Sequence, residues 1–332
     1  MRSLRLLIPI AGIALTGCLE PTGEPLRVHV PPGATFAQVT DSLADRGIIP
    51  GRRIFKFYAR ISGTDVRIRP GTYGFRRGEP WQKILADLRD GNVLTTRLVI
   101  PEAYSLDKIA ARIAEITRSD SATILAYMTD TAIATRYGVP GPTLEGYLYP
   151  ATYRIGVDLP LDTVLTTLVN RYRQIWTPER KARADSLGMT EREVVALASI
   201  VEKEAKKRDE MPIIASVYHN RLRIGMRLQA DPTVQYALGQ HRARLLYRDI
   251  DSVTDHPYNT YRNGGLPPGP IGSPSTMGID AVLYPANTKF LYFVAKPDGS
   301  HVFTTSLAEH NRAKNAIARE RRRAAAQKPA QR

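Results

Sequence analysis

The chain has 332 residues, a formal net charge of +15, 43% hydrophobic residues and 24% charged residues. This length allows two domains with their own cores, and the composition is that of a globular protein, which excludes a wholly disordered chain. The positive charge comes mostly from arginine and suits an anionic partner such as the cell envelope or nucleic acid. The single cysteine excludes an intramolecular disulfide and a cysteine-based metal cluster.

The N-terminus has the pattern of an export signal. Two arginines precede an apolar run over residues 6–15, which ends in the lipobox-like sequence Leu15-Thr16-Gly17-Cys18. This run is shorter than the ~20 apolar residues that a transmembrane helix needs. We therefore expect residues 1–18 to be a lipoprotein signal peptide with lipid on Cys18, and residues 19–26 to be a tether. The alternative is a single N-terminal transmembrane anchor in the inner membrane.

Either anchor places the protein outside the cytoplasm. It would be exported, held to a membrane through its N-terminus, and would face the periplasm or the cell wall. Export argues against nucleic acid as the anionic partner, even though the net charge of the chain would suit it.

Two similar strand–turn–helix units follow the tether. In the first, residues 28–30 are predicted to form a strand and Thr35 to cap a helix. In the second, residues 98–100 form the strand and Ser105 caps the helix, so the two units match at one constant offset. We expect residues 27–94 to form a small module, whose shared capping and core positions leave a purely structural role open.

A helix that carries two glutamates lies further along the chain. Thr190 and Glu193 form a capping box, which predicts that this helix begins near residue 191. At 100° per residue, Glu202 and Glu204 fall on the two borders of its apolar face, roughly 160° apart. Two carboxylates that diverge in this way cannot form the acid/base pair of an ordinary glycosidase. If one of them is catalytic, it acts without the other.

The neighbours of the two glutamates favour Glu202. Ala198 and Ser199, one turn earlier, leave room for a ligand, whereas the bulky Ile200 stands one turn before Glu204. The competing interpretation is that both glutamates are solvated and pair with basic residues four positions later in the sequence.

The remaining chain predicts a mixed α/β domain. A helix is expected over residues 211–221, and a hairpin over residues 290–304. Residues 258–277 are dense in Pro, Gly, Asn and Tyr and are expected to form an irregular, functional loop. The basic tail, residues 319–332, has no apolar period and is expected to be either frayed helix or disordered.

An ordered set of short motifs runs through this domain together with the glutamate helix. In this order and at these spacings, the set resembles the MltG (YceG-like) family of endolytic murein transglycosylases, and the resemblance covers roughly residues 28–311. The motifs are Leu144-Glu145-Gly146-Tyr147-Leu148, Ala198-Ser199-Ile200-Val201-Glu202-Lys203-Glu204, Asn220-Arg221-Leu222, Gln229-Ala230-Asp231-Pro232-Thr233, Tyr258-Asn259-Thr260-Tyr261, Gly265-Leu266-Pro267-Pro268-Gly269 and Tyr292-Phe293-Val294.

The resemblance implies an α+β fold, with a LysM-like module at residues 27–94 and a YceG-like catalytic domain at residues 95–318. Such modules bind the N-acetylglucosamine backbone of peptidoglycan. Family enzymes cleave the MurNAc-GlcNAc β-1,4 bond within glycan strands and leave 1,6-anhydroMurNAc ends. The family role implies action on nascent strands, whose length it limits, with peptidoglycan synthases as further partners. Family members usually carry a spanning N-terminal helix, so this chain departs from the pattern.

Cleavage of a glycosidic bond needs a proton for the leaving oxygen, and a Glu beside an apolar face can hold that proton because desolvation raises its pKa. A lytic transglycosylase uses the C6 hydroxyl of the muramic ring as nucleophile, so one carboxyl group can act as acid and then as base. We expect Glu202 to be this residue. Candidate substrate-binding residues are Glu145, Gln229, Asp231, Thr233, Asn259 and Tyr261. A buried structural carboxylate at Glu145 and a turn former at Asp231 are the open alternatives.

We expect no metal and no cofactor, since the histidines are scattered and no His-Glu-x-x-His motif is present. A rival enzyme class is suggested by the Ser-x-x-Lys of residues 105–108, but the other motifs of acyl enzymes are missing. The remaining alternative is a non-catalytic peptidoglycan-binding lipoprotein of the same fold.

The lipid anchor can be tested by processing of the precursor. Cys18→Ser removes the acylated side chain and should leave a full-length, unprocessed precursor, whereas the wild-type protein should begin at an acylated Cys18. Mass spectrometry of the membrane fraction measures both. An intact Met1 in the wild-type protein would reject the lipoprotein interpretation in favour of the transmembrane anchor.

Overall fold

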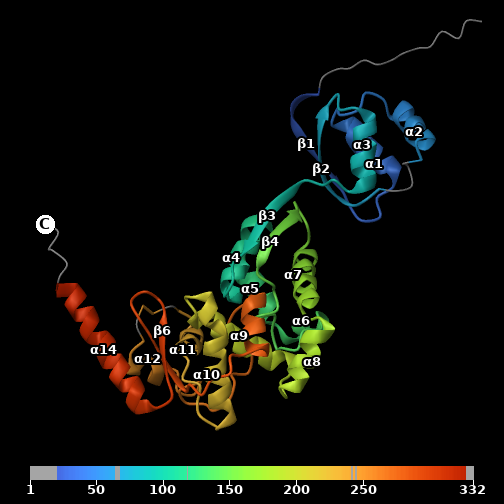
Figure 1. Cartoon of the computed structure of the whole chain (residues 1–332). Coiled ribbons are helices and arrows are strands. Elements are labelled where there is room, and N and C mark those ends of the chain that lie inside the picture. Colours follow the sequence, from blue (N-terminus) through green and yellow to red (C-terminus); the bar gives the residue numbers. More distant parts are fainter. Residues whose placement is uncertain (1–20, 64–67, 118, 241, 244, 327–332) are drawn as a thin grey trace, which may run out of the picture. The chain divides into compact units, whose positions relative to one another are not determined.

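The computed structural model of the chain describes residues 21–63, 68–117, 119–240, 242–243 and 245–326 (Figure 1). Its contacts divide into two units: residues up to 96 with 156–158, and residues 97–155 with 159 onward. This division falls close to the boundary expected at residue 94. The expected signal peptide and Cys18 lie outside the described residues. Within the described ranges, no helix is long and apolar enough to span a membrane.

The N-terminal unit packs helices against a two-stranded sheet. Its elements are β1 (Thr22–Val30), α1 (Phe36–Asp45), α2 (Arg52–Ile61), β2 (Gly71–Arg77) and α3 (Trp81–Asp90). The strands are antiparallel, with Val28 opposite Tyr73 and Leu26 opposite Phe75. Alternate strand residues therefore face the same side, where they are buried with Leu43, Phe55 and Ile84 of the helices. The capping box at Thr35 starts α1, as the sequence predicts.

The larger unit is mostly helical. Its elements are β3 (Thr95–Ile100), α4 (Leu106–Thr117), α5 (Ser121–Thr129), α6 (Thr131–Arg136), β4 (Ala151–Gly156), α7 (Leu161–Ile175), α8 (Pro178–Ser186), α9 (Glu191–Glu204), η1 (Arg208–Glu210), α10 (Met211–Arg223), α11 (Asp231–Ala237), α12 (Tyr247–Ser252), α13 (Thr276–Leu283), β5 (Tyr292–Ala295), β6 (His301–Thr304) and α14 (Leu307–Ala326). Over the described residues, β3–β4 and β5–β6 form separate two-stranded sheets. The overall class is α+β, and the expected mixed α/β domain is a helical unit with small sheets.

Helix α9 lies at the centre of the C-terminal core. Thr190 and Glu193 form the predicted capping box at its start. Every side chain from Val194 to Glu202 is buried, because α8, α10, α11 and α13 all pack against this helix. The expectation that only one face of this helix is buried, with Glu202 and Glu204 on its borders, is therefore wrong for most of α9. A helix that is apolar nearly all round is placed inside a core, where several neighbours share its surface.

The other elements predicted for the larger unit can be compared with the structure. The helix expected over residues 211–221 is α10, and the hairpin is β5–β6, with Phe293 opposite Phe303. The irregular loop ends at Ser275, because α13 begins at the next residue. Helix α14 continues through Ala326, so residues 319–326 are helical, the first of the two alternatives expected for the tail.

Candidate active site

Glu202 is held against the N-terminus of α13. Its carboxylate oxygen Oε2 accepts hydrogen bonds from the Ser275 backbone N–H at 3.0 Å and from the Ser275 hydroxyl at 2.7 Å. The residue is only 9% exposed. Burial raises the pKa of Glu202, and the two Ser275 hydrogen bonds act in the opposite direction. This carboxyl group is thus engaged in a contact between two helices.

The room expected beside Glu202 is filled by the protein itself. A Cβ atom added at Gly278 of α13 would lie 2.5 Å from Glu202 Oε2 and 3.5 Å from the Ala198 carbonyl oxygen. The absence of a side chain at residue 278 is therefore what lets α13 approach α9 so closely. The small residues before Glu202 admit a helix, and the interpretation of that space as a ligand site is corrected.

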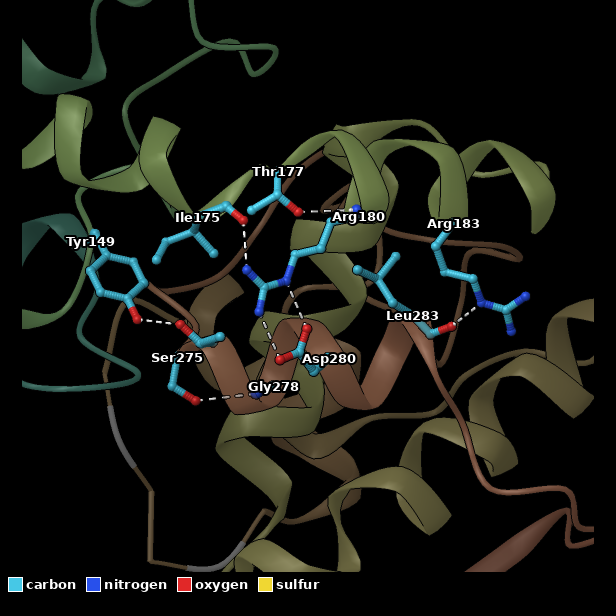
Figure 2. A network of polar contacts seen from close by, with 10 residues as sticks. Tyr149, Ile175, Thr177, Arg180, Arg183, Ser275, Gly278, Asp280 and Leu283 are labelled. Carbon is cyan, nitrogen blue, oxygen red and sulfur yellow. Dashed lines mark hydrogen bonds and ion pairs between the residues drawn. The ribbon is translucent and has the colours of Figure 1, made fainter.

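A polar network fixes α13 in this position (Figure 2). Arg180 of α8 donates two hydrogen bonds to the Asp280 carboxylate, at 2.8 and 2.9 Å, and a third to the Ile175 carbonyl oxygen at 2.7 Å. At the start of α13, the Ser275 hydroxyl oxygen accepts the Gly278 N–H at 3.1 Å. Ser275 therefore caps α13 and binds Glu202 at the same time.

Glu204 lies in a different environment. The residue is partly exposed, and its Oε1 accepts a hydrogen bond from the Tyr218 hydroxyl at 3.1 Å. Burial raises the pKa of Glu204 to about 7; the Asp231 charge adds to this effect, while Tyr218 and Arg221 oppose it. Among the described residues, none donates a hydrogen bond to Oε2. The competing interpretation, in which the glutamates are solvated and pair with basic residues four positions later, is therefore wrong for Glu204.

Two of the predicted substrate-binding residues gather near Glu204. The Tyr261 hydroxyl donates to Asp231 Oδ1 at 2.6 Å. Burial raises the pKa of Tyr261, and the charges of Asp231 and Glu204 raise it further. Nearby, Arg221 is 7% exposed and donates to the carbonyl oxygens of Leu291 and Leu228, at 2.7 and 2.6 Å. The structure brings Asp231 and Tyr261 together around Glu204, not around Glu202.

The loop before α11 carries the other predicted residues. Gln229 is exposed and has φ of 46°, a left-handed conformation that is uncommon for a residue other than glycine. Its N–H donates to the Thr260 carbonyl oxygen at 3.1 Å, which ties this loop to the segment that contains Tyr261. Backbone strain of this kind concentrates at ligand-binding positions.

Thr233 and Asn259 are fully buried. The Thr233 hydroxyl donates to the Ala230 carbonyl oxygen at 2.7 Å. The Asn259 amide donates to the carbonyl oxygens of Ile250 and Val253, both at 3.0 Å. Their polar groups hold the loops in place, so the expectation that these two side chains touch the substrate is replaced by a supporting role.

Glu145 lies apart from both glutamates of α9. It is 3% exposed, and its Oε2 accepts the Leu106 N–H at 3.2 Å at the start of α4. Its Oε1 is buried without a hydrogen bond, and burial raises the pKa of Glu145 to about 7, against the charge of Lys203. Lys203 itself donates a hydrogen bond to the Ala103 carbonyl oxygen at 2.8 Å. The capping role expected of Ser105 is taken by Glu145, while the Ser105 hydroxyl binds Asp107.

A cavity of about 850 Å³ lies along the first half of α9, and none of the predicted site residues lines it. The His219 and Asn220 side chains on its wall bind backbone carbonyl oxygens of the fold. Its carboxylate, Glu193, is engaged in the capping box of α9. We therefore place the candidate chemistry at Glu204, where a carboxyl group with a raised pKa lies among the polar side chains of Tyr218, Asp231 and Arg221. Over the described residues, no cluster of His, Cys, Asp and Glu could hold a metal ion.

The sequence interpretation missed Glu204, Tyr218 and Arg221 as site residues. Helical geometry placed Glu204 correctly on the side of α9 opposite Glu202. The signal that could have found the site is the shared motif set: Arg221, Asp231 and Tyr261 all lie in the short motifs quoted above.

An α+β protein with a carboxyl group of raised pKa among polar side chains has the kind of site that acid–base enzymes use. Residues 28–316 match the YceG-like family, and the chain belongs to this family, as its motifs predict. It is 32% identical over 308 residues to the endolytic murein transglycosylase of Bacillus subtilis (strain 168), a match that covers 87% of this chain and 84% of that protein.

Two further relatives support the same family membership. The endolytic murein transglycosylase of Streptococcus pneumoniae serotype 2 is 30% identical over 317 residues, which cover 86% of this chain and 57% of that protein. The crystal structure of a yceG-like protein from Listeria monocytogenes matches with a TM-score of 0.60 and 34% identity, over 88% of this chain and 100% of that one.

The contact between α9 and α13 can be tested at Gly278. Gly278→Ala places a Cβ atom against Glu202 Oε2 and should lower the free energy of unfolding by ~1–3 kcal/mol, the usual result of overpacking. Chemical denaturation followed by circular dichroism measures this. Gly264→Ala is the matched control, because a Cβ atom there would meet nothing within 4 Å. Equal stability of the two variants would contradict the close packing.

Proposed function

We propose that this protein is an endolytic peptidoglycan lytic transglycosylase, which cleaves the MurNAc-GlcNAc β-1,4 bond within glycan strands and leaves 1,6-anhydroMurNAc ends. Membership of the YceG-like family and the names of its relatives support this reaction. Action on nascent strands, with peptidoglycan synthases as partners, is part of the proposal.

We propose Glu204 as the general acid and base. The observation that carries this assignment is a pKa of about 7 on a partly exposed carboxyl group whose Oε2 accepts no hydrogen bond from the described residues. An acid with such a pKa is still partly protonated near neutral pH. Glu202, which the sequence favours, has its Oε2 bound twice by Ser275 and is nearly closed to solvent.

The proposed reaction needs a single carboxyl group. Protonated Glu204 donates its proton to the glycosidic oxygen as the bond from the muramic anomeric carbon breaks. The C6 hydroxyl of the same ring then bonds to that carbon, and the Glu204 carboxylate accepts the hydroxyl proton. The residue ends protonated, as it began. Positive charge on the sugar is met by its own acetamido group, as in substrate-assisted glycosidases.

Nearby side chains have distinct parts in this proposal. The Tyr218 hydroxyl fixes Oε1 and leaves Oε2 to face the substrate. Asp231 offers its second carboxylate oxygen, and Gln229 its exposed amide, to sugar hydroxyl and acetamido groups. Tyr261 orients Asp231 and offers an aromatic face. Glu145 acts as the cap of α4, so we propose no direct contact between it and the sugar.

A matched pair of substitutions tests the acid. Glu204→Gln removes the transferable proton and should lower the rate of strand cleavage by at least ~10²–10⁴, the usual contribution of general acid catalysis. Glu202→Gln keeps an amide oxygen that can accept both Ser275 hydrogen bonds, so it should lower the rate less than about tenfold. Muropeptide analysis of digested peptidoglycan, with circular dichroism to check folding, measures both.

The same digestion separates the alternatives. Products of the wild-type protein should carry 1,6-anhydro ends and arise from within strands. Ordinary reducing ends would show that water is the nucleophile and would make the protein a hydrolase. An inactive Glu202→Gln beside an active Glu204→Gln would return the assignment to Glu202. No products at all would favour the non-catalytic peptidoglycan-binding lipoprotein.

The pH dependence of cleavage provides a second test. Glu204 must be protonated to act as an acid, and its pKa is raised to about 7, so the rate should fall as the pH rises above about 7. Glu145 also has a pKa of about 7. The Glu145→Gln variant should therefore keep the alkaline loss if Glu204 causes it. Disappearance of that loss in the variant would assign it to Glu145 instead.

We propose that the N-terminal unit is the LysM-like module and holds glycan for the catalytic unit; a purely packing role competes with this. Deletion of residues 28–91 should weaken binding to insoluble peptidoglycan more than it lowers turnover of a short soluble glycan. Co-sedimentation with peptidoglycan and a turnover assay measure the two effects. Equal losses in both assays would favour the packing role.

A further inference from the structure

Helix α2 of the N-terminal unit presents a row of large apolar side chains to solvent. Ile54, Phe57 and Ile61 are 65%, 65% and 71% exposed, while Phe55 and Ala59 on the opposite side are fully buried. The exposed residues are three and four positions apart, so they form one stripe along the helix. The buried side already fixes α2 to its unit, which leaves this stripe without a partner in the chain as described.

Unpaired positive charge runs beside this stripe. Arg52 and Lys56 pair with Asp41, at 3.3 and 3.6 Å. Arg53 and Arg60 are exposed, and within the described residues neither forms an ion pair. At 100° per residue these two arginines lie roughly 40–60° from Phe57, along one edge of the stripe. The helix therefore combines an apolar stripe with a cationic edge.

We infer that α2 docks on an anionic lipid surface, with Ile54, Phe57 and Ile61 at the boundary of the acyl chains and Arg53 and Arg60 among the headgroups. Aromatic and branched aliphatic side chains on one face, with arginine along its edge, are what a helix lying in the membrane interface requires. A second copy of the same face would bring the same arginines together. A glycan could stack on Phe57, but it offers nothing that matches the aliphatic side chains of Ile54 and Ile61.

The proposed lipid on Cys18 would complement this contact. Helix α2 is only ~15 Å long, so its own membrane affinity is modest and a second attachment is needed. Thr22, where β1 begins, follows Cys18 by four residues, which span at most ~14 Å when extended. A chain anchored at Cys18 therefore keeps the N-terminal unit within reach of the headgroups.

The test places a fluorescent reporter on the stripe. In the full chain, Cys18→Ser removes the only cysteine, and the unprocessed precursor keeps the apolar run of residues 6–15 as its second attachment to the membrane in place of the lipid. Phe57→Cys in this background allows one environment-sensitive label. The protein is reconstituted with phosphatidylcholine vesicles, with and without phosphatidylglycerol. We expect a blue shift and a several-fold rise in emission on anionic vesicles. The matched control is the label at Tyr247→Cys, which is 84% exposed in the other unit and should not respond.

Charge variants complete the test. Arg53→Glu with Arg60→Glu should raise the concentration of phosphatidylglycerol-containing vesicles needed for half of the response at least ~10-fold, because each arginine near an anionic surface contributes to binding. No change at residue 57 on anionic vesicles would overturn the proposal. A blue shift of the label in the absence of lipid would also overturn it. If that shift grows with protein concentration, the stripe is covered by a second copy of the protein. Turnover of a soluble glycan by these variants reports on the catalytic proposal separately.

Discussion

The hydrogen bonds between Ser275 and Glu202 are the contact on which the core of the larger unit depends most. They join the end of the central helix α9 to the start of α13, and they satisfy polar groups that are otherwise buried in a core. A buried carboxylate without such partners would be strongly destabilising. With them, the carboxylate becomes a specific packing element, because only a helix that begins with a correctly placed N–H and hydroxyl can fit there.

Because of this contact, the two glutamates of α9 have different roles. Two residues apart on a helix, they point to nearly opposite sides, so one joins the packing of α13 while the other reaches Tyr218 and the loops that carry Asp231 and Tyr261. In our proposal, structural support and chemistry come from neighbouring positions of one helix. A helix that is buried over most of its length is a suitable base for an acid that must be placed accurately.

Sequence reasoning was most successful where the signal was local. The capping boxes at Thr35 and Thr190 and the turn of the β5–β6 hairpin act within a few residues, so composition and spacing predicted them. It failed where the environment of a residue is set by segments far away in the sequence. The partner of Glu202 lies 73 positions away, and space beside a small residue looks the same in sequence whether a ligand or a helix fills it. Likewise, Asn259 has the polar side chain expected of a residue that binds sugar, and only its burial shows that it supports a loop.

The two carboxyl groups with pKa values near 7 link folding to proton uptake. Glu145 and Glu204 titrate near 4.5 in an unfolded chain and near 7 in the fold. Between these values the folded protein binds more protons than the unfolded chain, so the free energy of unfolding falls as the pH rises through this window. Folding at neutral pH therefore draws protons from solution. These two carboxyl groups therefore stabilise the fold more in mildly acidic solution than in alkaline solution.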